Sequence, residues 1–212
     1  MFPSVATIRT AIAELRFRPI LVALALMPCV TALLAASGID AAANRFAQGA
    51  MPFWLSVVWS APALILGLVA PVLIPLQAGL LPQTRAHAPR LWLALGLSLA
   101  LVSVLKALTG RIHPEALVPA DLYARSLGFT LLGGELVEGW PSGHAATNGA
   151  VALVLAQASP SPTIRRLSIA WLVWVWAAVV LGINGQVHWL SDMVAGALLA
   201  AATARSLSTP ER

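Results

Sequence analysis

The chain has 212 residues, of which 59% are hydrophobic and only 10% are charged. Soluble domains carry about 25% charged residues, so the composition excludes an ordinary soluble domain and indicates a single all-α membrane domain over residues 1–212. The 13 Lys and Arg outnumber the 8 Asp and Glu, but they stand singly between apolar stretches, which is typical of membrane topology and not of nucleic-acid binding. Cys29 is the only cysteine, which excludes an internal disulfide, and we expect it to be a small buried hydrophobic residue.

The N-terminal region, residues 1–19, is predicted to be an interfacial amphipathic helix. Apolar residues recur there at helical spacing beside two arginines: Val5, Ile8, Ile12 and Leu15, with Arg9 and Arg16. A secretory signal ending near 35–38 is the alternative interpretation of this region and the first apolar stretch. The sequence leaves open whether that first span is cleaved.

Apolar stretches predict six transmembrane helices. They run over Ile20–Ser37, Phe53–Leu81, Leu91–Leu108, Ser142–Ala158, Leu167–Gly182 and His188–Ala204. The second is long and contains Pro62, Pro71 and Pro75, so we expect one bent helix there. The fourth is short, which suits a helix whose first turn belongs to a site.

Charges sort by alternate loops, and this sorting predicts the topology. One side holds only arginines among its basic residues: Arg9, Arg16, Arg18, Arg85, Arg90, Arg165, Arg166, Arg205 and Arg212. The other side holds mixed charges: Asp40, Arg45, Lys106, Arg111, Glu115, Asp121, Arg125, Glu135, Glu138 and Asp192. We therefore expect both termini in the cytoplasm. The arginine-over-lysine, alanine-rich composition favours a bacterial inner membrane, with the site on its periplasmic or extracellular side.

The only long segment outside the predicted spans is residues 109–141, an extracytoplasmic loop that we expect to carry part of the site. A short helix over Pro119–Leu127 and a small hairpin over Phe129–Val137 are predicted within it.

Ser142, Gly143 and His144 follow Pro141 at the start of the fourth predicted helix. The free backbone N–H groups and positive dipole of a helix start favour an anion. Gly143 lets a phosphate approach the backbone closely, and Ser142 adds a hydroxyl donor. A simple N-cap at Ser142 is the alternative.

His188 and Asp192 are one helical turn apart, so the carboxylate can hold one ring nitrogen protonated and leave the other as a nucleophile. With His144 as an acid for the departing oxygen, this set suits phosphoryl transfer. A zinc site is the alternative, but a helix start with Gly and Ser favours an anion. We therefore expect no metal and no other cofactor.

Three blocks in this order resemble the signatures of the type-2 phosphatidic-acid phosphatase superfamily, which shares a site with vanadium haloperoxidases. They are 106–114 (KALTGRIHP), 141–144 (PSGH) and 187–196 (VHWLSDMVAG). The resemblance implies that His188 attacks phosphorus, Asp192 orients it and His144 protonates the leaving group. It also implies phosphate ligands at Lys106, Ser142 and Gly143, a phosphohistidine intermediate and no metal.

Two family arginines are replaced. His113 stands where the first block has arginine before Pro114, and Leu181-Gly182 stand where the third block has Ser-Arg. An arginine clamp holds phosphate by charge-assisted, bidentate hydrogen bonds. Arg111, five residues after Lys106, is the first candidate replacement, and His113 is the second. Neutral donors at Asn184 and Gln186 are further candidates.

The predicted function is a phosphatase acting on a membrane lipid phosphate or diphosphate at the outer face. Candidate substrates are phosphatidic acid, phosphatidylglycerol phosphate, polyprenyl phosphates or diphosphates and lipid A. A lipid phosphotransferase is a close alternative, and a non-catalytic lipid-phosphate binder or transporter is a more distant one. Expected partners are the lipid and the membrane, not nucleic acid. The oligomeric state is open.

Overall fold

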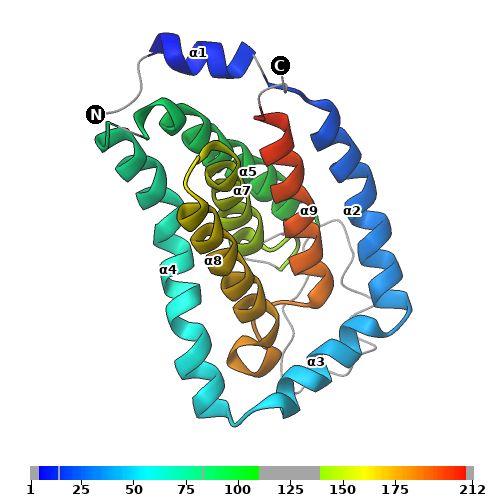
Figure 1. Cartoon of the computed structure of the whole chain (residues 1–212). Helices are drawn as coiled ribbons and strands as arrows, with labels where there is room; N and C mark the ends of the chain where they lie inside the picture. Colours follow the sequence, from blue (N-terminus) through cyan, green and yellow to red (C-terminus); the bar gives the residue numbers. More distant parts are fainter. Residues whose placement is uncertain (1–4, 14, 83, 110–138, 209–212) are drawn as a thin grey trace.

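The computed structural model describes residues 5–13, 15–82, 84–109 and 139–208. Within these ranges every regular element is helical, which confirms the all-α prediction (Figure 1). The elements are α1 (Val5–Ala13), α2 (Arg18–Ala36), α3 (Ile39–Ala50), α4 (Phe53–Leu80), η1 (Arg85–His87), α5 (Ala88–Thr109), α7 (Gly143–Ala158), α8 (Pro162–Leu181), η2 (Gly182–Gly185) and α9 (Leu190–Ser206).

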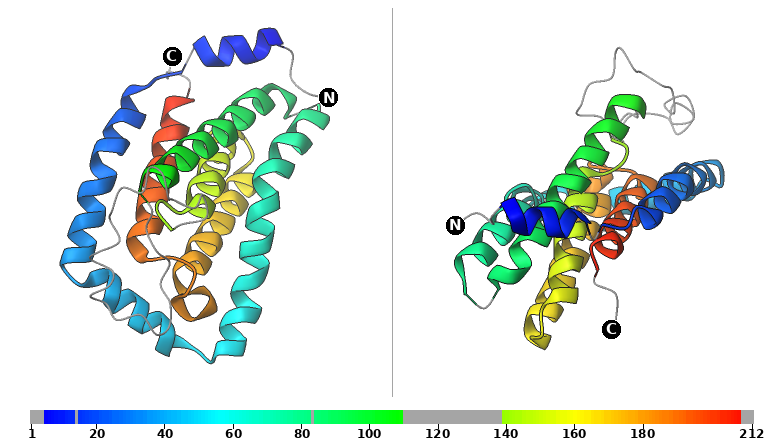
Figure 2. Two further views of the ribbon diagram at one scale, coloured as in Figure 1. Left: turned by 180° about the vertical axis from the view of Figure 1, so that it is seen from behind. Right: turned by 90° about the horizontal axis from the view of Figure 1, so that it is seen from above.

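Two short helices lie across opposite ends of the bundle. Figure 1 shows α1 at the end where α9 finishes, and α3 at the end where η2 leads into α9. Helix α1 packs against α5, whereas α3 packs against α2, α8, α9 and η2. The view from above in Figure 2 shows α1 lying over the bundle and α2 along one side of it. The described N- and C-terminal segments therefore lie at the same end.

Four of the described helices are long and apolar enough to cross a membrane, so the chain is an integral membrane protein. They cover Arg18–Ala36, Phe53–Leu80, Arg85–Thr109 and Pro162–Gly185. Helices also form at the two other predicted positions, but α7 has 16 residues and α9 has 17. At 1.5 Å per residue they reach about 24 and 26 Å, short of a hydrocarbon core of about 30 Å. The structure thus does not confirm six spans.

Helix α4 presents its large side chains outward and its small ones inward. Its buried residues recur at helical spacing: Ser56, Ser60, Ala63, Gly67, Pro71, Pro75, Ala78 and Gly79. Leu68 and Ile65 on the other face are 68% and 62% exposed. This distribution suits a helix that packs through small residues and faces lipid with large ones. It is one continuous helix through its three internal prolines, as the sequence predicts.

Helix α7 is the centre of the bundle and packs against α4, α5, α8 and α9. Glycines allow its close contact with α9. A Cβ on Gly149 would lie 2.5 Å from the Cβ of Ala200, and one on Gly196 would lie 2.6 Å from the carbonyl oxygen of Ser142. Both distances are shorter than contacts between non-bonded atoms, so these two helices meet at a separation that only glycine permits.

Three sequence-based predictions concern Cys29, α1 and residues 119–137. Cys29 is exposed on α2, so the prediction of a buried cysteine is wrong. An apolar side chain on a membrane helix can face either lipid or the protein interior. Helix α1 ends at Ala13, and its interfacial location stays a prediction. The helix and hairpin predicted within 119–137 lie outside the described residues.

Candidate active site

The second and third sequence blocks meet at the end of the bundle where α3 lies. The backbone N–H of Ser142 donates to the carbonyl oxygen of Asp192 at 3.0 Å. Gly196, one turn further along α9, brings that helix against the same segment. The start of α7 and the start of α9 are therefore held together by backbone contacts, although they are about 50 residues apart in the sequence.

Ser142 is the N-cap of α7. Its hydroxyl oxygen accepts a hydrogen bond from the backbone N–H of Ala145 at 3.3 Å, and its side chain is fully buried. Capping satisfies one of the free N–H groups of the first turn. Gly143 lines the neighbouring cavity instead. In this arrangement Ser142 caps the helix start and Gly143 lies at the cavity wall.

His188 and Asp192 form a buried pair, 6% and 0% exposed. The Nδ1 atom of His188 lies 3.4 Å from Oδ2 of Asp192. The same carboxylate oxygen accepts from the backbone N–H of Trp189 at 3.0 Å. Because Asp192 is fixed in the first turn of α9, it holds the imidazole from its Nδ1 side.

His144 is held by the backbone of α4. Its Nε2 lies 3.0 Å from the carbonyl oxygen of Leu64, and a carbonyl only accepts, so Nε2 carries the hydrogen in this contact. One turn further along, Asn148 donates to the carbonyl oxygen of Gly67 at 2.8 Å. That carbonyl has no helical donor, because the residue four positions later is Pro71. Asn148 thus ties α7 to α4 at the level of His144.

A cavity of about 460 Å³ lies beside the two histidines. Lys106, Gly143, His144 and His188 line it, together with Thr147 and Val187. The rest of its described wall is apolar and comes from α4 and α5: Gly67, Leu68, Pro71, Val72, Leu95 and Leu99. The cavity therefore has a polar part with one lysine and two histidines, and an apolar part between two membrane helices.

A family model described as the PAP2 superfamily matches residues 89–209. The chain belongs to the PAP2 superfamily. Its fold is similar to the "first transmembrane PAP2 type phosphatidylglycerolphosphate phosphatase from Bacillus subtilis", with a TM-score of 0.65 and 19% sequence identity over 91% of this chain and 94% of that chain. That likeness establishes the fold. No curated protein matches the sequence at a significant level.

One departure of this PAP2 member from the family pattern has a steric counterpart. Gly182 stands where the sequence resemblance places a family arginine, and a Cβ there would lie 2.6 Å from Cβ and 2.8 Å from Oγ of Ser60. No side chain fits at this position while α4 keeps its place. A guanidinium from residue 182 is thus incompatible with the packing between α4 and η2.

Hydroxyl groups of α4 hold the backbone that follows. Ser56 accepts from the backbone N–H of Asn184 at 2.9 Å, and Ser60 accepts from that of Ile183 at 3.3 Å. Both donors have left-handed backbone angles, with φ of 51° and 47°. This turn leads directly to His188, so α4 fixes the approach of the chain to the buried pair. Asn184 and Gln186 are not among the described residues lining the cavity.

Helix α3 contributes two contacts that the sequence does not reveal. Asp40, 1% exposed, accepts from the backbone N–H of Ser191 at 2.8 Å and from its hydroxyl group. Asn44, one turn later, donates to the carbonyl oxygen of Gly185 at 2.8 Å. The carboxylate therefore caps the start of α9, next to Asp192. A lone acidic residue in an alanine-rich helix was the only sequence signal for it.

Two predicted phosphate ligands, Arg111 and His113, lie outside the described residues. Lys106 is the one Lys or Arg side chain that lines the cavity in the described part of the chain. The described ranges contain no group of three or more His, Cys, Asp or Glu side chains arranged to hold a metal ion. The indole N–H groups of Trp140 and Trp171 have hydrogen-bond partners within the helix bundle. That of Trp140 donates to the hydroxyl oxygen of Thr31 at 2.8 Å, and that of Trp171 donates to the side-chain oxygen of Asn148 at 3.1 Å.

Proposed function

We propose that this chain is a phosphatase that hydrolyses a lipid phosphate or diphosphate at the outer face of the membrane, through a phosphohistidine on His188. One observation carries the proposal: a single cavity combines Lys106, Gly143 and both histidines with an apolar wall between α4 and α5. A soluble phosphate ester needs only the first part of this cavity. A lipid phosphate needs both parts.

The dimensions of the apolar part support a lipid. Leu95 and Lys106 lie eleven residues apart on α5, which corresponds to about 16 Å along the helix. Leu68 and Leu99 line this part and are 68% and 53% exposed. The cavity therefore opens toward lipid between α4 and α5, and a tail can enter from the bilayer while the headgroup stays at Lys106.

The first chemical step is attack by Nε2 of His188 on phosphorus. Asp192 fixes the ring by its contact at Nδ1 and stabilises the positive charge that develops as the P–N bond forms. The bond from phosphorus to the lipid oxygen breaks. His144 gives its proton to that oxygen, so the lipid leaves as an alcohol, or as a phosphate from a diphosphate.

Hydrolysis reverses the roles. His144, now neutral, takes a proton from water as the water oxygen attacks phosphorus, and the P–N bond breaks to release inorganic phosphate. The carbonyl oxygen of Leu64 orients this imidazole from Nε2, which leaves Nδ1 for proton transfer. Lys106 and the backbone N–H of Gly143 stabilise the phosphoryl oxygens, and Arg111 and His113 are the predicted additional ligands.

Phosphate release by the detergent-purified protein tests the proposal. The assay uses a panel of phosphatidic acid, phosphatidylglycerol phosphate, polyprenyl phosphate, polyprenyl diphosphate and lipid A, each with and without chelator. We expect release from at least one lipid that persists with chelator and disappears in His188→Ala. His87→Ala is the matched control, because His87 lies in η1, at the opposite end of the bundle from α3. Equal activity in His188→Ala refutes the mechanism.

The two alternatives give different results in the same assay. A phosphotransferase releases little phosphate from lipid alone, but it forms phosphohistidine on His188 and transfers the phosphoryl group when an alcohol acceptor is added. A non-catalytic binder binds the lipid phosphate and never forms phosphohistidine. Gly182 motivates this comparison, because the sequence resemblance places a phosphate-binding arginine at this position and the chain has glycine there.

The proposed orientation places both termini in the cytoplasm and the site at the outer face. The described ends of the chain lie together at the end of the bundle opposite α3 (Figure 1). Accessibility of single cysteines introduced at Ser4 and Thr209 in a Cys29→Ser background would place both termini. Labelling of either from the outside of intact cells refutes a cytoplasmic location.

A further inference from the structure

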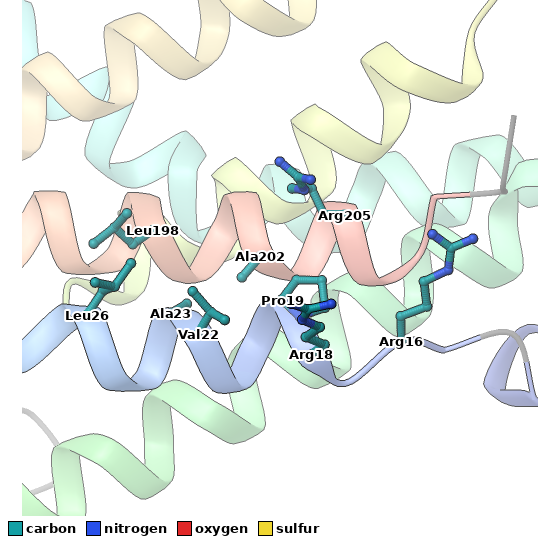
Figure 3. A pocket seen from close by; sticks show the side chains of 9 residues that line it. All are labelled: Arg16, Arg18, Pro19, Val22, Ala23, Leu26, Leu198, Ala202 and Arg205. Atoms are coloured by element: carbon teal, nitrogen blue, oxygen red, sulfur yellow. The ribbon is translucent and has the colours of Figure 1, made fainter.

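A second groove lies between α2 and α9, away from the site described above. It has a volume of about 710 Å³, larger than the catalytic cavity. Figure 3 shows the two helices side by side, with three arginines at one end and Leu26 and Leu198 at the other. The residues between them are Pro19, Val22, Ala23 and Ala202. The groove thus has a cationic end and an apolar length.

The arginines come from two distant parts of the chain. Arg16 and Arg18 flank the start of α2, and Arg205 lies in the last turn of α9. The backbone N–H of Arg16 donates to the carbonyl oxygen of Ser206 at 3.1 Å, so the two segments that carry the arginines are joined to each other. All three side chains are exposed, and no carboxylate of the described ranges pairs with them, since Asp40 and Asp192 lie at the starts of α3 and α9.

The apolar length has the depth and reach of an acyl-chain seat. Ala23 and Ala202 are buried at 4% and 6% and form its floor, whereas Val22 and Leu26 remain 51% and 47% exposed. Small residues on both helices therefore leave room between larger ones. Arg18 and Leu26 are eight residues apart on α2, or about 12 Å. One leaflet of hydrocarbon is about 15 Å thick, so the groove runs through most of a leaflet.

Cationic side chains at one end of an apolar groove select a ligand with an anionic head and an apolar tail. We propose that this groove binds an anionic glycerophospholipid of the cytoplasmic leaflet, with its phosphate at the arginine end of the groove and an acyl chain along α2. Arginine suits this role because it forms bidentate, charge-assisted bonds with phosphate. A zwitterionic lipid leaves a cationic amine beside three guanidinium groups.

Scattered cytoplasmic arginines are common in membrane proteins, so what distinguishes these three is that they line one groove. Arg165 and Arg166 lie in the first turns of α8 on the same predicted face and line no part of this groove. They provide a matched control pair. The groove is also independent of the proposed catalysis, because none of its lining residues belongs to the catalytic cavity.

The test uses full-length protein purified in detergent, stripped of lipid and titrated with dioleoyl phosphatidylglycerol or dioleoyl phosphatidylcholine. Thermal unfolding and native mass spectrometry report binding. We expect saturable stabilisation by phosphatidylglycerol alone. The double variant R18Q/R205Q should weaken that binding about 30-fold, whereas R165Q/R166Q leaves it unchanged. Val22→Trp keeps the arginines but fills the apolar length, and should also weaken binding.

Four outcomes overturn the proposal. Equal weakening in both double variants indicates general attraction to basic residues. Equal stabilisation by phosphatidylcholine indicates no selection by charge. Loss of binding in Lys106→Gln, with binding retained in R18Q/R205Q, places the lipid in the catalytic cavity. A dimer in lipid-free detergent that R18Q/R205Q abolishes assigns the groove to a second copy of the chain. Unfolding temperatures without lipid verify that each variant is folded.

Discussion

Asp40 is predicted to control the geometry of the proposed catalytic pair, His188 and Asp192, without contacting substrate. Its carboxylate accepts two hydrogen bonds from Ser191, whose N–H belongs to the first turn of α9. Ser191 immediately precedes Asp192, which holds His188. Replacing Asp40 by alanine leaves a buried N–H and hydroxyl group without this acceptor and removes a negative charge from a helix start.

The magnitude follows from these contacts. Hydrogen bonds to a charged group contribute about 1.5–3 kcal/mol each, so losing two costs about 3 kcal/mol or more. For a chain of this size, 3 kcal/mol lowers the unfolding temperature by about 6–12 °C. Misplacing a catalytic group by about 1 Å costs on the order of 100-fold in rate. Asp40→Ala should therefore lose stability and about 100-fold in kcat, with KM nearly unchanged.

The assay combines thermal unfolding of the purified protein with steady-state phosphate release. Asp40→Asn retains an acceptor for the N–H of Ser191, so about tenfold in kcat and about 1–2 kcal/mol are expected to be lost. Arg45→Gln is the matched control, because Arg45 is an exposed residue on the same helix. Wild-type kcat and unfolding temperature in Asp40→Ala would show that α3 does not position α9.

Two further predictions concern residues near the same turn. Gly182→Ala places a Cβ within 2.6 Å of Ser60 and should destabilise the fold by about 1–3 kcal/mol. Gly49→Ala is the control and should be neutral or stabilising, because a Cβ there would have no atom within 4 Å. A Gly182→Ala unfolding temperature at or above that of Gly49→Ala contradicts the packing argument. Asp192→Asn should keep the fold but lower kcat by about 100-fold or more, since an amide holds His188 less firmly in the reactive tautomer; initial rates at saturating lipid measure this, and an unchanged rate refutes the orienting role.

Much of the helical framework follows from the sequence because it depends on local composition. Apolar runs predict helices at the positions of α2, α4, α5, α7, α8 and α9, and all of these form. Six complete crossings do not follow from the same runs, because α7 and α9 begin in polar turns at the site and are 16 and 17 residues long. The orientation of Cys29 was not predictable, since lipid and protein interior are both apolar surroundings.

The candidate site, like the helical framework, could be predicted only in part from the sequence. The order and spacing of Lys106, His144, His188 and Asp192 in the sequence predict the family, and the family model confirms it. The roles of these residues remain predictions. Their residue types and spacing can be read from the sequence, because they fall within single helical turns and short blocks. The sequence alone therefore determined the family and an apolar, helical protein.

Only the tertiary structure decided what surrounds that constellation. Asp40 meets Ser191 across 151 residues, and Ser56 meets Asn184 across 128. Such contacts depend on how helices cross and leave no local pattern in the chain. The same holds for the space between helices: the apolar cavity wall and the arginine-lined groove are formed by side chains from separate segments. Local patterns determined the helices and the positions of the candidate site residues in the chain, whereas long-range packing decided which backbone groups hold these residues and which cavities lie between the helices.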